Sequence, residues 1–328
     1  MEKTGISAHS RDFTESEIRS FVDDLEFLQS GDLTVSLLVG CGEAAIVPLR
    51  DYLLRGEPRC IFQPRQRAVD ALIQLGAKEV LIEYLSQRRT IPDFEVRFAE
   101  EAVENTAARG LSRWLREDVF RFLCDLADRR MLTGVVETLG RFERLEAAPI
   151  LIRALGDSVC HTVADEALRK IADEVKPLLL TVATHLSPEY EKPSERQRRR
   201  FIVRILSDLA LSARDWEILR PLLKSEDKTI ARTVAQVAVD RAPEGERREA
   251  ARFLIHSLGG APWFEQMRIQ ECLERSYSAV CDVIEHEDAL RRETITGPPL
   301  ADPVTRILEK VRATHLEPRG NRENRHGE

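Results

Sequence analysis

A repeat of about 32 residues constrains the fold of this chain more than any other feature. Residues 130–186 hold two consecutive copies of one helix pair, and the rest of the chain reads as weaker versions of it. Leu139 and Ile171 take equivalent positions, 32 residues apart, and equal steps towards the N-terminus reach Ala107 and Leu75. A unit of this size is too thin to bury its own apolar face, so neighbouring units must stack. The period predicts an all-α protein, an α-solenoid of stacked helix pairs.

The two clear copies share one order of signals. In the first copy an apolar helix ends at Gly140, and a second helix starts near Ala147 with Pro149 in its first turn. In the second copy residues 163–171 make the first helix, and Pro177 takes the place of Pro149 in the second. Proline suits the first turn of a helix because its missing N–H group would have no partner there. The pattern predicts short helix–turn–helix units.

Composition agrees with amphipathic helices better than with a sheet protein. Of the 328 residues, 32% are charged, 43% are apolar and only 6% are aromatic. The formal net charge of −7 argues against a general nucleic-acid-binding protein, because such proteins usually carry a basic excess. Composition therefore disfavours nucleic acid as a partner, although a local basic face stays possible.

The cysteines indicate reduced, buried thiols. They contain no C-x-x-C pair, so the sequence predicts neither a zinc site nor a disulfide framework. We also expect no other metal and no cofactor. The N-terminus lacks an apolar signal core, and no apolar run approaches the ~20 residues of a membrane span. We therefore expect a soluble cytoplasmic protein without membrane contact. The six cysteines are Cys41, Cys60, Cys124, Cys160, Cys272 and Cys281.

Shifts in composition divide the chain into a repeat region and flanking segments. Thr14 followed by Glu17 reads as a capping box that opens the first helix. The polar stretch 187–194 predicts a loop within the repeats, and residues 263–287 predict one longer helix or a helix pair that caps the stack. We predict a disordered N-terminus over 1–13, the α-solenoid over 14–290, a Pro-rich linker over 291–303, a short helix over 304–315 and a disordered tail over 316–328.

One segment carries a family resemblance. In residues 90–110, TIPDFEVRFAEEAVENTAARG, Pro92-Asp93 leads through Val96-Arg97 into an alanine-rich helix. This resembles the HEAT-like repeat of bacterial proteins, the type also found in phycobilisome lyases, and the likeness extends with decreasing clarity over about residues 33–260. The resemblance implies a right-handed α-solenoid, a HEAT/ARM-like superhelix in which the second helix of each repeat lines the inner, concave wall. The resemblance says little about function, because the repeated residues are those that packing requires.

The same register selects the candidate binding residues. Four arginines fall in the exposed slot of the second helices, and a guanidinium can hold a carboxylate or phosphate through two parallel hydrogen bonds. They predict a basic stripe along the inner wall, whose N-terminal end stays acidic. The competing interpretation is that they are ordinary solvated positions in an arginine-rich protein. In chain order the slot holds Asp51, Glu83, Arg121, Arg153, Thr181, Arg220 and Arg252, with His256 as an alternative to Arg252.

Other groups of residues favour structural roles. The basic run 196–204 spreads around a helix, so it lines no single groove. Trp114, Trp216 and Trp263 lie near helix starts among apolar residues, where we expect them to pack. The pair His286-Glu287 is similar to one ligand pair of HEAT-like di-iron hydroxylases, but a metal site needs several converging ligands. Neighbours such as Cys160 and His161 point about 100° apart on a helix, which does not suit a nucleophile and its base.

Three functions follow from these observations. The first is a non-catalytic scaffold whose concave face binds an acidic segment or helix of a partner protein. The second is a lyase or isomerase that holds a pigment or another acidic small molecule in the groove, although no convincing acid, base or nucleophile is present. The third is a HEAT-like DNA-binding protein or glycosylase. The sequence favours the first and leaves the partner and the oligomeric state open.

Overall fold

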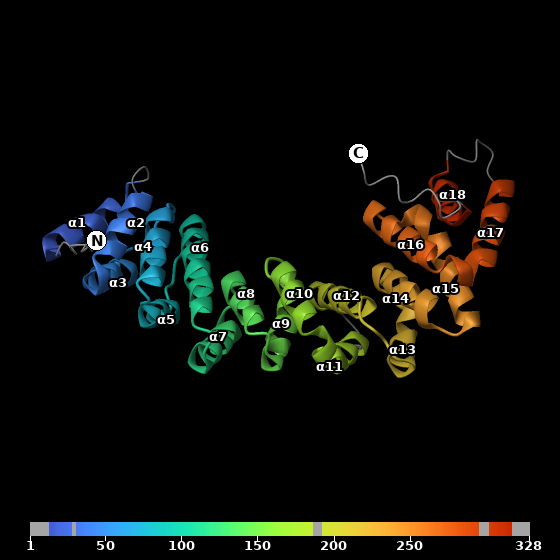
Figure 1. The fold of residues 1–328 in the computed structure, drawn as a ribbon, viewed down its shortest axis with the longest axis horizontal. Helices are drawn as coiled ribbons and strands as arrows, with labels where there is room; N and C mark the ends of the chain where they lie inside the picture. The colour runs from blue at the N-terminus through green and yellow to red at the C-terminus, as the bar shows by residue number, and fades with distance from the viewer. Residues whose placement is uncertain (1–12, 28–30, 186–191, 295–301, 317–328) are drawn as a thin grey trace, which may run out of the picture. The chain divides into compact units, whose positions relative to one another are not determined.

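The computed structural model describes residues 13–27, 31–185, 192–294 and 302–316 (Figure 1). The structure is 81% helix and has no strand in these residues, so the predicted all-α class is confirmed. By their contacts the residues divide into two compact units, 1–171 and 172–328.

Two rows of helices build the first unit. Successive members of the first row, α2, α4, α6, α8 and α10, contact one another, as do successive members of the second row, α3, α5, α7 and α9 (Figure 1). Each second-row helix also packs on at least one first-row helix, namely α3 on α4, α5 on α4 and α6, α7 on α8, and α9 on α8 and α10, and α1 packs on α2 and α3. The bounds are α1 Glu15–Asp24, α2 Gly31–Gly40, α3 Ile46–Arg55, α4 Gln63–Gln74, α5 Lys78–Ser86, α6 Phe94–Gly110, α7 Glu117–Arg129, α8 Thr133–Arg141, α9 Ala148–Ala154 and α10 His161–Lys170.

The second unit repeats this arrangement. Its first row is α12, α14, α16 and α18, in which each helix contacts the next, while α11 contacts α13 and α15 contacts α17 in its second row. Helix α14 also packs on α13 and α15. The bounds are α11 Ala172–Thr184, α12 Pro193–Ser207, α13 Ala213–Leu219, α14 Lys228–Arg241, α15 Glu244–Ser257, α16 Trp263–Arg275, α17 Tyr277–Thr294 and α18 Pro303–Leu316.

Local signals explain several helix ends. The backbone N–H of Glu17 donates to Thr14 Oγ1 at 3.3 Å and that of Thr14 donates to Glu17 Oε2 at 2.8 Å, so the predicted capping box is confirmed. Asp93 caps α6 by accepting from the Val96 N–H at 3.0 Å. Gly76 ends α4 with a φ of 76°, a backbone conformation that favours glycine. These contacts satisfy backbone groups that a helix end leaves open.

The repeat positions lie in the core as predicted. Leu139 and Ile171 are both buried, at 0% and 4% exposure. The predicted helix end at Gly140 lies one residue short, because α8 continues to Arg141. A Cβ atom on Gly140 would lie 2.5 Å from Ala167 Cβ, so this glycine allows the close approach of α8 to α10. The glycine serves packing rather than helix termination.

Helix α11 differs from the prediction as well. It begins at Ala172, so Pro177 lies inside the helix rather than in its first turn, unlike Pro149 at the start of α9. Residues 263–287 form a helix pair, because α16 ends at Arg275 and α17 starts at Tyr277.

The flanking segments also differ from the prediction. Helix α17 continues to Thr294, so residues 291–294 of the predicted linker are helical. Helix α18 packs on α16 and α17 and buries Val304, Leu308 and Val311, which makes it part of the second unit's core. Phe13 packs edge-on against Phe21. Leu316 belongs to α18, and the remaining residues of the two predicted disordered ends lie outside the described residues. Most of the predicted 187–194 loop also lies outside them, whereas Pro193 and Ser194 belong to α12.

Candidate interaction surfaces

The four predicted arginines lie on second-row elements. Arg121 is on α7 and Arg153 on α9 in the first unit, whereas Arg220, at the start of a 3₁₀ turn (Arg220–Lys224), and Arg252 on α15 belong to the second unit. All four are exposed, as predicted. The structure therefore presents two arginine pairs, one in each unit.

Each of these arginines forms an ion pair with a carboxylate of its own unit. Arg121 Nε lies 2.7 Å from Glu117 Oε1 on the same helix, and Arg153 Nη2 lies 2.8 Å from Asp128 Oδ1 on the neighbouring α7. Pairing with carboxylates makes the local surface mixed in charge rather than a basic stripe. The sequence reasoning missed these partners, because three of the four ion pairs join residues from different elements.

The second unit repeats the pattern. Arg220 Nη2 lies 2.7 Å from Glu246 Oε1 on α15, and Arg252 Nε lies 3.0 Å from Glu287 Oε1 on α17. His256 Nε2 lies 2.7 Å from the other oxygen of Glu287, so both alternatives for the predicted slot contact one carboxylate. Burial raises the pKa of Glu287, but hydrogen bonds from His256 and Arg252 outweigh it, and the pKa lies below its usual value.

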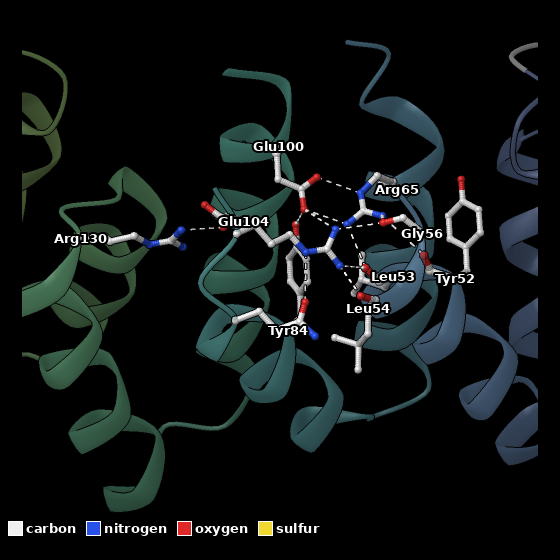
Figure 2. Close-up of polar contacts among 11 residues, drawn as sticks. Tyr52, Leu53, Leu54, Gly56, Arg65, Tyr84, Glu100, Glu104 and Arg130 are labelled. Atoms are coloured by element: carbon white, nitrogen blue, oxygen red, sulfur yellow. Dashed lines mark hydrogen bonds and ion pairs between the residues drawn. The ribbon is translucent and has the colours of Figure 1, made fainter. Parts of the chain in front are cut away.

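Sequence reasoning missed a buried ion-pair cluster in the first unit (Figure 2). Arg65 on α4 donates from Nε and Nη2 to the two carboxylate oxygens of Glu100 on α6, at 2.9 and 2.8 Å. The hydroxyl of Tyr84 on α5 donates to the same carboxylate at 2.7 Å. Arg65 and Glu100 are only 4% and 3% exposed, so the pair is shielded from solvent screening.

Two guanidinium groups of this cluster meet at the C-terminal end of α3. Arg65 Nη2 donates to the carbonyl oxygen of Leu53 at 2.9 Å, and Arg89 donates to the carbonyl oxygens of Leu53 and Gly56, both at 3.0 Å. The last carbonyl groups of a helix have no partners within the helix and carry partial negative charge. The two guanidinium groups therefore supply hydrogen-bond donors to these carbonyl oxygens of α3, and Arg65 links α3 to α4 and α6.

A second ion pair extends the cluster to the following helix. Arg130, the residue after α7, lies 2.8 Å from Glu104 of α6, and Figure 2 shows Arg130 and Arg65 approaching the carboxylates of α6 from opposite sides. Burial raises the pKa of Glu104, and the nearby charge of Arg130 offsets only part of this rise. Arg65, Glu100, Glu104 and Tyr84 are buried and Arg130 is half-buried, so the cluster holds helices together rather than forming an open binding surface. One feature of the sequence indicates the buried cluster: Arg65 lies one helical turn before Val69, on the face of α4 where the spacing of Val69 and Leu72 predicts an apolar residue.

A polar recess of about 430 Å³ lies among α12, α14 and α16. Its charged groups partly neutralise one another, since Arg275 Nη2 lies 2.6 Å from Asp240 Oδ2. Cys272 lies in its wall, and burial raises the pKa of that thiol to about 12. A thiol that is protonated at neutral pH is a weak nucleophile, so this recess does not suit cysteine chemistry.

The three tryptophans have different surroundings. Trp216 is buried, and its indole N–H donates to Glu246 Oε2 at 3.2 Å, whereas Trp114 is half-buried. The expectation that Trp263 packs is wrong, because 71% of it is exposed. Helix α16 buries the face that carries Ile269 and Leu273, and Trp263 lies on another face. An apolar residue at a helix start therefore does not have to join the core.

Comparison with known proteins gives no family. No protein-family model and no curated protein matches this chain. The likeness to HEAT-like repeats therefore stays a prediction. In the described part of the chain no group of three or more His, Cys, Asp or Glu residues is arranged to hold a metal ion. No helix there is both long and apolar enough to cross a membrane.

Proposed function

We propose that this chain is a non-catalytic, cytoplasmic α-solenoid scaffold of the HEAT-like type, which binds an acidic segment of a partner protein along its second-row helices. The sequential packing of helix rows within each unit supports the scaffold. In a stacked array each repeat contacts its neighbours and the exposed slots of successive second helices lie side by side. The proposed surface of the first unit consists of Arg121 and Arg153.

The observation that carries the proposal is the way these arginines are held. Arg121 is bound to Glu117 through its Nε, and Arg153 through Nη2 to both Asp128 and the carbonyl oxygen of Ala127 at 3.0 Å. These contacts orient each guanidinium while its side chain stays exposed, at 76% for Arg121 and 46% for Arg153. Exposed ion pairs contribute only about 0–1 kcal/mol, so a carboxylate of a partner can compete with the internal one. Preorganised arginines with weak internal partners suit reversible recognition of acidic segments.

The test uses the first unit, where a matched control exists. Arg141 on the first-row helix α8 is 51% exposed and pairs with Glu137 four residues earlier, much as Arg121 pairs with Glu117. We expect a partner recovered with the wild-type chain from its native host to bind the Arg121→Ala/Arg153→Ala variant at least tenfold more weakly, because each charge-assisted contact is worth about 1.5–3 kcal/mol. The Arg141→Ala variant should bind as the wild type does.

Three outcomes oppose this function. Equal weakening by Arg141→Ala would show that the second-row surface is not the binding site. Recovery of a chromophore, detected by its absorbance spectrum, would favour a lyase. Recovery of nucleic acid without a protein partner would favour a DNA-binding protein.

A further inference from the structure

A groove between α1 and α3 is lined by more carboxylates than cations. Its volume is about 520 Å³, and its walls come from one face of α1 and from α3 with the turn before it. Val22 and Pro48 line the interior, and Val47 opens onto it with 63% of its surface exposed. A recess of this size can accept several side chains of a bound peptide.

The charges around the groove are mainly acidic. Glu15, Asp23 and Asp51 line it together with a single cation, Arg19, and Arg19 Nη2 is already 2.6 Å from Glu15 Oε1. Asp51 has only distant, exposed partners, at 3.6 Å from Arg50 and 3.5 Å from Arg55. Asp23 has no basic partner among the residues that the structure describes. Asp23 is thus open to a ligand, and a cationic ligand can compete with the exposed, weak ion pairs of Asp51.

This combination specifies the occupant. An exposed apolar side chain between acidic rims fits an amphipathic segment that places an apolar residue over Val47 and Lys or Arg side chains beside Asp23 and Asp51. We propose that the groove between α1 and α3 binds a basic amphipathic segment of a partner protein. This site is separate from the arginine surface and does not depend on the function proposed for it.

The experiment measures fluorescence anisotropy of a labelled amphipathic peptide of Lys and Leu, titrated with the full-length chain at two salt concentrations. A peptide of Glu and Leu with the same pattern is the probe control. The Asp23→Asn/Asp51→Asn variant removes the two carboxylates of the groove. Its matched control is Asp32→Asn/Glu79→Gln, which makes the same change in charge at exposed positions of the same unit outside the groove.

We expect the basic peptide to bind the wild-type chain, more weakly at high salt because the contacts are exposed. Asp23→Asn/Asp51→Asn should weaken this binding about tenfold, as expected for two charged contacts of moderate strength, whereas the control variant should not change it. Val47→Ser should weaken binding several-fold through lost apolar contact, while Val159→Ser, at a residue 66% exposed elsewhere in the unit, should not.

The opposite results overturn the proposal. The acidic peptide would bind as tightly as the basic one, or the control variants would weaken binding as much as the groove variants do. A Kd for the basic peptide above about 1 mM, the range of very weak contacts, would overturn it too.

Discussion

Individual buried residues carry information that the helical pattern does not. Arg65 and Glu100 occupy the core of the first unit, where ion pairing has to offset the loss of water. Tyr84 donates a further hydrogen bond to Glu100, and Arg65 also donates to the carbonyl oxygens of Leu53 and Gly56. The burial of a charged group therefore defines its partners more strictly than the burial of a leucine does.

We predict that Glu100→Gln lowers the free energy of unfolding by about 3–5 kcal/mol, because it leaves the buried guanidinium of Arg65 without a countercharge. Glu15→Gln, which breaks the exposed pair with Arg19, should change it by less than about 1 kcal/mol. Chemical denaturation of both variants checks this. A cost below about 1 kcal/mol for Glu100→Gln would contradict the role of the buried pair.

Close helix contacts depend on glycines of α8. A Cβ atom on Gly134 would lie 2.2 Å from the carbonyl oxygen of Asn105, a backbone atom that cannot move aside easily. We predict that Gly134→Ala destabilises the protein by about 1–3 kcal/mol through overpacking. Gly40, at the end of α2, has open space around it, so Gly40→Ala should be neutral or stabilising. Thermal unfolding of the two variants should therefore give opposite or clearly different shifts.

At the scale of elements, α18 depends on the residue that precedes it. Asp302 accepts the backbone N–H of Thr305 at 2.9 Å and lies 2.7 Å from Arg291 Nε on α17. The hydrogen bond from Arg291 is the main cause that lowers the pKa of Asp302 to about 2, against the opposing effect of burial. One carboxylate thus caps α18 and joins it to α17.

The sign of the pH dependence follows from the lowered pKa of Asp302. The stabilisation is complete above the unfolded-state pKa, about 3.8, and is lost as the pH falls towards about 2. We predict that Asp302→Asn, which keeps a capping side chain but removes the charge, costs about 1–2 kcal/mol at neutral pH. The difference from the wild type should shrink between pH 4 and pH 2 in denaturation experiments. A difference that is unchanged at pH 2 would show that charge is not its cause.

At the scale of the molecule, each of the two compact units has its own buried core. We predict that Leu139→Ala costs the first unit about 2–5 kcal/mol, through lost transfer free energy and a cavity. Hydrogen exchange measured by mass spectrometry should become faster in α6, α8 and α10. Exchange in α14 should stay unchanged, and an equal increase there would mean that the two units unfold as one.

The sequence alone determined the helices and their buried faces. Thr14 with Glu17, Asp93 and Gly76 act on backbone groups only a few residues away, so their effects can be predicted without the fold. The spacing of Leu139 and Ile171 likewise predicted burial, because helical periodicity selects one face for the core. The exposed positions of the four arginines followed from the same periodicity.

The tertiary structure alone decided which side chains meet across helices. Arg65 and Glu100 are 35 residues apart, and Arg153 and Asp128 are 25 apart, so no local pattern links them. Pairing depends on which helices lie side by side and at what distance, which also explains why Trp263 stays exposed while α18 joins the core. The candidate arginines were predictable, but their charge environment was not, because a carboxylate partner on a neighbouring helix becomes visible only when the helices pack.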